Sequence, residues 1–259
     1  MTIDLHDYSL SIIFLVSVVF ILAASEAGRL LGARAVGRGG DDVSTLEGAI
    51  LGLLALMIGF TFAMALSRFE ARRDAVLTEA NAIGTTALRA RLLPAPHNVD
   101  VNKLLQEYVR IRLDITQHVP SSTELNAAIK RSNEIQEALW QQTKLVAAKD
   151  SGMVPTGLFV QTLNEMIDNQ GKRLEALRNR VPNIVLMVLY GVAIIAGALT
   201  GYANGLEVRH VRLPVYVTGL LIASVILLIE DLDRPNAGFV KTSQQPMIDT
   251  AAAIASYND

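Results

Sequence analysis

The chain has 259 residues, of which 51% are hydrophobic and 19% are charged, and its formal net charge is −2. This composition is too apolar for an ordinary soluble domain, and the near-neutral charge argues against nucleic acid as a partner. Because the chain has no cysteine, disulfides, thiolate metal sites and cysteine nucleophiles are excluded.

Four apolar stretches are long enough to cross a membrane, whose hydrocarbon core requires about 20 residues. The residues before the first stretch include aspartate but no lysine or arginine, so we interpret that stretch as a retained span rather than a secretion signal. The four predicted spans cover approximately residues 9–31, 46–67, 182–204 and 212–230.

An even number of spans places the N-terminus, residues 68–181 and the tail 231–259 on the same side of the membrane. Arginine and lysine near the span ends are more numerous on that side. Positive residues favour the cytoplasm. The sequence therefore predicts a multi-pass protein of the cell (inner) membrane, with both termini and residues 68–181 in the cytoplasm.

The longest predicted helix covers residues 46–91. Its first half is apolar, its second half is rich in charge, and it contains no proline. Residues 68–181 also show helical periodicity, and hydroxyl residues at 121–123 are suited to cap a helix. No strand-like alternation stands out. We therefore predict an all-α fold, a four-span helical membrane protein whose long helices extend into a cytoplasmic helical bundle, with residues 1–259 forming a single unit.

Small residues recur at steps of three or four in two of the spans. Such residues allow helices to approach closely in lipid, where helices have no hydrophobic drive to associate. Packing within one chain and packing between copies both fit this pattern, and the first is favoured. The residues are Gly48, Gly52, Ala55, Gly59, Ala63 and Ser67 in the second span, and Ala193, Gly197, Gly201 and Gly205 in the third.

Three carboxylates, Glu230, Asp231 and Asp233, lie at the C-terminal end of the fourth span. The helix dipole is negative there, so this placement requires a cationic partner. Ca²⁺ takes about six to eight oxygen ligands, and no EF-hand spacing is present. A salt-bridge network is favoured over a bound cation, and the identity of any metal stays open. The candidate protein partners are Arg72, Arg73, Arg178 and Arg180.

Motifs of the common enzyme classes are not found. The chain has no GxSxG, Walker loop, dinucleotide fingerprint or HExxH. We therefore predict that the protein is not an enzyme and has no cofactor, with Ca²⁺ as the one open alternative.

Two segments resemble the bacterial bestrophin-like family, whose domain has no assigned function. The first comprises Gly59–Phe62, Ser67–Arg73 and Glu79–Gly84, and the second is the closing run Asp231–Gly238. The resemblance spans nearly the whole chain. Its layout is more distantly similar to that of true bestrophins, which are oligomeric ion channels with a pore-lining second helix and an acidic Ca²⁺ clasp after the fourth. This chain lacks a long acidic run there, so only the plan is carried over.

The resemblance implies a homo-oligomeric ion channel, a pentamer by analogy, with lipid and inorganic ions as its other partners. Arg68, Arg72 and Arg73 would form a charged cytoplasmic mouth that favours anions over cations. Phe60 and Phe62 point in different directions on a helix, so only one of them can face a common axis. The candidate pore-lining residues are Phe62, Gly59, Leu66, Met64 and Phe60.

A non-conducting membrane scaffold or sensor is the alternative. In that hypothesis the long helix relays a signal through the cytoplasmic helices. The small-residue patterns and the almost apolar second span favour it, because such a span offers little to a hydrated ion. A solvated axis beside the second span would favour the channel.

Overall fold

The computed structural model describes residues 8–35, 40–116, 121–149, 153–207, 211–235 and 238–257. These residues form eight α-helices and one π-helical turn, with no strand among them. The all-α prediction is therefore confirmed. Residues 1–7, whose side of the membrane is part of the prediction, lie outside the described ranges, as do Asn236 and Ala237 of the closing run.

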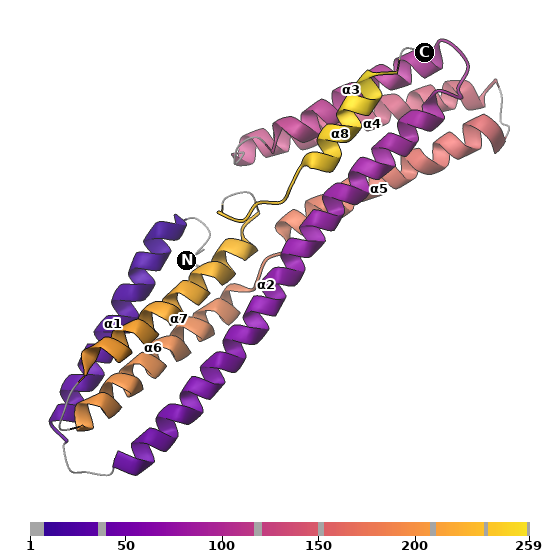
Figure 1. Cartoon of the computed structure of the whole chain (residues 1–259). Helices are drawn as coiled ribbons and strands as arrows, with labels where there is room; N and C mark the ends of the chain where they lie inside the picture. Colours follow the sequence, from indigo (N-terminus) through magenta and orange to yellow (C-terminus); the bar gives the residue numbers. More distant parts are fainter. Residues whose placement is uncertain are drawn as a thin grey trace. The chain divides into compact units, whose positions relative to one another are not determined.

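Four helices are long and apolar enough to span a membrane, as the sequence predicts. They are α1 (Leu10–Ala33), α2 (Gly40–Ala90), α6 (Asn183–Leu206) and α7 (Arg212–Asp233). The long helix predicted over 46–91 is α2, which begins earlier, at Gly40 (Figure 1). The remaining elements are α3 (His97–Asp114), α4 (Ser122–Ala147), the π-helical turn η2 (Met153–Gly157), α5 (Leu158–Arg178) and α8 (Gln245–Ala255).

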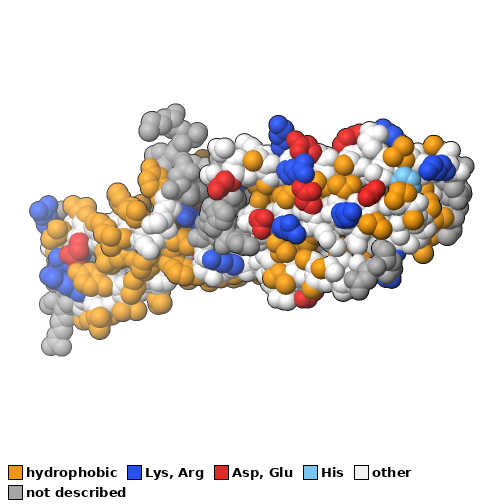
Figure 2. Space-filling model, turned by 90° about the horizontal axis from the view of Figure 1, so that it is seen from above, with side chains coloured by type: hydrophobic (Ala, Val, Ile, Leu, Met, Phe, Trp, Pro, Cys, Tyr) orange, Lys and Arg blue, Asp and Glu red, His pale blue; other side chains and the backbone are white. Residues whose placement is uncertain are grey.

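The chain divides into two compact units. One, the membrane unit, comprises residues 1–68, 180–234 and 238–240, and the other, the bundle unit, comprises residues 69–179, 235–237 and 241–259. Helix α2 contributes its first part to the membrane unit and its second part to the bundle unit. Figure 2 shows hydrophobic side chains over much of the surface of the membrane helices, and acidic and basic side chains scattered over the bundle unit.

Helices α1 and α6 of the membrane unit pack with almost no space between their backbones. A Cβ atom added to Gly201 would lie 1.9 Å from the carbonyl oxygen of Ser25, and one added to Gly28 would lie 1.9 Å from that of Ala198. Only glycine fits at such distances. The small residues of the third span therefore pack within the chain, and for this helix the favoured interpretation is confirmed.

The bundle unit has a continuous apolar core. Ile83 of α2, Leu105 of α3, Leu139 of α4 and Phe159 of α5 are all fully buried in it. Helix α4 begins with a capping box in which Ser121 accepts from the amide of Glu124, as expected for a hydroxyl at 121–123. Helix α8 adds its own buried residues, Met247 and Ile254, to the same core.

Candidate functional site

One face of α2 in the membrane unit is exposed along its whole length and carries the small residues of the second span. A Cβ atom added to Gly48, Gly52 or Gly59 would meet nothing within 4 Å. The opposite face packs, since Leu54 and Thr61 are each 2% exposed. The exposed residues, which we call the α2 ridge, are Gly48, Gly52, Ala55, Gly59, Ala63 and Ser67.

The candidate pore residues fall at different positions around this helix. Gly59 belongs to the α2 ridge, and the neighbouring Phe60 is 65% exposed. Phe62, Met64 and Leu66 are half-buried. The structure thus gives the two phenylalanines different surroundings, in agreement with the helical spacing.

The three arginines that follow also differ from one another. Arg73 is exposed, and Arg68 is half-buried and donates from Nη1 to the carbonyl oxygen of Met64 at 3.4 Å. Arg72 is only 3% exposed. The positive charge that solvent reaches in this stretch therefore comes from Arg68 and Arg73.

The three carboxylates at the end of α7 are buried, and two of them, Asp231 and Asp233, face backbone amides. Asp233 accepts from the amide of Val181, at 2.9 and 3.0 Å, just before the start of α6. Asp231 accepts from the amides of Phe239 at 2.6 Å and Val240 at 3.0 Å. These donors offset part of the negative charge at the helix end. Among the described residues, no group of three or more His, Asp or Glu side chains is arranged to hold a metal.

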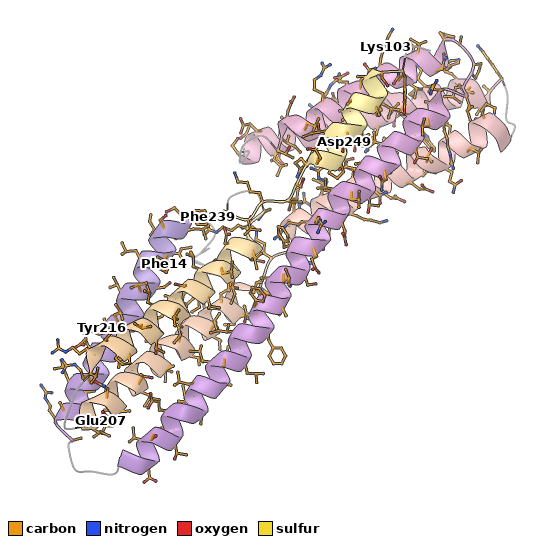
Figure 3. The ribbon with its side chains drawn as sticks, in the orientation of Figure 1. Phe14, Lys103, Glu207, Tyr216, Phe239 and Asp249 are labelled. Atoms are coloured by element: carbon orange, nitrogen blue, oxygen red, sulfur yellow. The ribbon has the colours of Figure 1, made fainter. Side chains whose placement is uncertain are left out.

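The closing run of the sequence has a clear geometric basis. A Cβ atom added to Gly238 would lie 2.0 Å from Oδ1 of Asp231, so glycine lets the chain pass the carboxylate without displacing it. The segment held in this way carries Phe239, which is 79% exposed and follows α7 in the sequence (Figure 3). Glu230, the third carboxylate, lies beside Tyr190 of α6.

An ionic cluster that we did not predict from the sequence lies inside the bundle unit, around Glu79 of α2. Arg112 of α3 places Nε 2.9 Å from Glu79 Oε1, and Arg173 of α5 places Nη1 2.7 Å from Oε2. The hydroxyl of Tyr108 donates to Oε1 at 3.0 Å, and Arg173 also donates to Gln244 at 3.0 Å. We call Glu79, Tyr108, Arg112 and Arg173 the Glu79 cluster.

The Glu79 cluster is removed from water, since the side chains of Glu79 and Arg112 are both 0% exposed. Burial raises the pKa of the Tyr108 hydroxyl, and the adjacent Glu79 charge raises that pKa further. Tyr108 therefore stays protonated and donates to the carboxylate throughout the physiological pH range. The cluster ties three helices of the bundle together.

The chain is an all-α integral membrane protein with four membrane-spanning helices and a helical bundle. The long helix α2 contributes to both. Within that class of protein, the family model of the Bestrophin-like domain matches residues 13–247, so the chain belongs to the bestrophin-like family. The match includes the α2 ridge, the Glu79 cluster and the Asp231–Gly238 run. Among curated protein sequences, none matches this chain.

Solved structures of a bacterial bestrophin homolog from Klebsiella pneumoniae have a similar fold. One has a TM-score of 0.64 at 17% sequence identity and covers 95% of this chain and 96% of its own. A mutant form has a TM-score of 0.67 at 16% identity, with the same coverage of 95% and 96%. The likeness extends over both units of the chain.

Proposed function

We propose that the chain forms a homo-oligomeric ion channel of the bacterial inner membrane, with α2 as the pore-lining helix and the bundle unit in the cytoplasm. The observation that carries the proposal is the α2 ridge. It is a continuous exposed face on a membrane helix, and a Cβ atom added to its glycines would meet no described atom within 4 Å.

Small residues are a poor surface for lipid, but they let helices from different copies approach one another. The α6 glycines already use this property inside the chain, against α1. The α2 ridge has no such partner within the described part of the chain at Gly48, Gly52 and Gly59. A ring of copies would bring the ridges together around a common axis, and a pentamer is the arrangement we infer by analogy with bestrophins.

The residues next to the ridge provide an apolar constriction. Hydrophobic constrictions can close a pore by dewetting. Phe60, with 65% of its surface exposed beside Gly59, is well placed for this role. Phe62, Met64 and Leu66 are half-buried and would form the walls between neighbouring copies.

We infer that anions are the favoured ions because the guanidinium groups of Arg68 and Arg73 are accessible at the end of the membrane part of α2. The exposed carboxylates of Glu70 and Asp74 lie in the same stretch and reduce this positive field. A ring of copies would repeat these guanidinium groups around the mouth, raising the local anion concentration. The carboxylates of α7 do not oppose this field at the mouth, since Glu230, Asp231 and Asp233 are buried.

The test is planar-bilayer recording of the purified full-length protein in asymmetric KCl. We expect a conductance whose reversal potential lies near the chloride equilibrium potential, and we expect Arg73→Glu to move it toward the potassium value. Ile195→Trp is the control, because Ile195 is 52% exposed on α6, a different helix from the one that carries the ridge, and should leave the reversal potential unchanged. Silence in every common salt, across voltage and Ca²⁺, would favour the scaffold or sensor instead.

A further inference from the structure

The Glu79 cluster contains more positive than negative charge. Two guanidinium groups, Arg112 and Arg173, share the single carboxylate of Glu79. Glu79 is also the only buried carboxylate in the described part of the bundle unit. The cluster therefore has an excess of one positive charge in a place that water does not reach.

The excess charge is located on Arg112. Its Nε and Nη2 atoms face Glu79, at 2.9 and 3.3 Å from the carboxylate oxygens. Its Nη1 atom is buried and has no hydrogen-bond partner among the described residues. A buried charged donor without an acceptor is strongly unfavourable. This atom therefore points to an acceptor that the described residues do not provide.

Two further buried polar groups without partners lie on the neighbouring helices. Gln170 of α5 accepts a hydrogen bond from Gln136 of α4, but its own amide nitrogen has no partner in the described structure. Ser132 is 0% exposed, and its hydroxyl is likewise without a partner there. Both groups can donate hydrogen bonds.

The helix directions place Ser132 on the same side of the Tyr108–Gln136 contact as Arg112, and Gln170 lies beside Gln136. Helices α3 and α4 run antiparallel, since His97 bonds Gln142 while Glu107 bonds Arg131. Tyr108 of α3 interacts with Gln136 of α4. Arg112 lies one turn after Tyr108 on α3, and Ser132 lies one turn before Gln136 on α4. Because the two helices are antiparallel, both steps run in the same direction along the bundle.

We propose that the bundle unit binds a small monovalent inorganic anion with the charge and size of chloride, held against Arg112 with Ser132 and Gln170 as additional donors. Such an anion supplies both the missing acceptor and the missing negative charge. A buried water molecule would supply an acceptor but would leave the charge uncompensated. The site lies in the bundle unit and does not depend on ion conduction by the protein.

The test is the thermal unfolding midpoint of the full-length protein as chloride replaces gluconate at constant ionic strength. A ligand that binds only the folded state raises the midpoint, and the stabilisation grows with the logarithm of the ligand concentration once that concentration exceeds the Kd. We expect the midpoint to rise with chloride and the rise to be lost in Arg112→Gln, which leaves Glu79 paired with Arg173 alone. Arg131→Gln is the control, since Arg131 is an exposed arginine paired with carboxylates, and it should keep the full rise.

A second variant, Glu79→Gln, is expected to strengthen chloride binding, whereas Arg112→Gln is expected to abolish it. Glu79→Gln raises the net charge of the cluster by one, so the chloride concentration at which the midpoint begins to rise should fall by about tenfold or more. If that variant does not fold, anomalous diffraction from crystals of the parent protein in bromide decides the matter. A bromide peak beside Arg112 supports the proposal. A midpoint independent of chloride, together with no bromide at Arg112, overturns it.

Discussion

At the scale of single residues, Tyr108 shows how a buried charge controls its neighbour. Its hydroxyl donates to Glu79, and both burial and the negative charge raise its pKa above the ordinary value of about 10. The folded state therefore favours the protonated hydroxyl more strongly than the unfolded state does. The resulting stabilisation is complete below pH about 10 and decreases as the pH rises above that value.

We predict that Tyr108→Phe lowers the free energy of unfolding at neutral pH by about 1.5–3 kcal/mol, because a hydrogen bond to a charged group is lost. The difference between parent and variant should shrink above pH about 10, where deprotonation of Tyr108 destabilises only the parent. Thermal unfolding at neutral and alkaline pH measures both effects. Tyr257→Phe, in the same unit, leaves Tyr108 in place and should show the parent's alkaline loss. A parent–variant gap that is constant with pH contradicts the prediction.

The residues that sequence reasoning missed had a detectable signal. The apolar face of the helix after Pro96 includes Val101, Leu105 and Tyr108, and the next position on that face is Arg112. A charge that continues an apolar face requires a buried partner. The partner Glu79 lies 33 residues earlier in the chain on another helix, so spacing along one helix could not identify it.

At the scale of helices, close packing of α1 on α6 depends on particular glycines. Gly201 has no room for a Cβ atom because of the Ser25 carbonyl, whereas a Cβ atom at Gly191 of the same helix would meet nothing within 4 Å. We predict that Gly201→Ala lowers the stability of the protein by about 1–3 kcal/mol, the usual effect of overpacking. Thermal unfolding of the detergent-solubilised protein measures this.

Gly191→Ala is the matched control for that prediction. Both substitutions replace glycine by alanine in α6, so both gain the same helix propensity. Only the first forces the α1 and α6 backbones apart. Equal thermal unfolding midpoints for the two variants would show that close packing of α1 on α6 does not contribute to the measured stability.

The sequence predicted the helices better than it predicted their partners. The four spans and the unbroken α2 follow from apolar length and from the absence of proline, which are local properties. The small-residue patterns in the second and third spans are alike in sequence, yet the third packs inside the chain and the second is exposed. The choice depends on which helices the fold brings together, and this information is not local.

At the scale of the whole molecule, the proposed channel requires copies of the chain to contact one another along the α2 ridge. The chain contains no cysteine, so a single introduced thiol can react only with the same thiol of another copy. We predict that Ala63→Cys, on the exposed ridge, gives covalent dimers with a flexible bismaleimide in membranes; one thiol per chain allows no larger covalent species. Denaturing gels then measure the fraction of the protein that forms a covalent dimer.

Two control positions separate assembly along α2 from random collision in the membrane. Leu15→Cys places a thiol on α1, at a residue that is 64% exposed, and Ala65→Cys places one on the buried face of α2, where exposure is 0%. Neither should cross-link if the ridges face one another. Equal cross-linking at Leu15 and Ala63 would mean that copies meet without a preferred face. If Ala63→Cys gives no dimer, the copies do not meet along α2, and the proposed ring and its pore are ruled out.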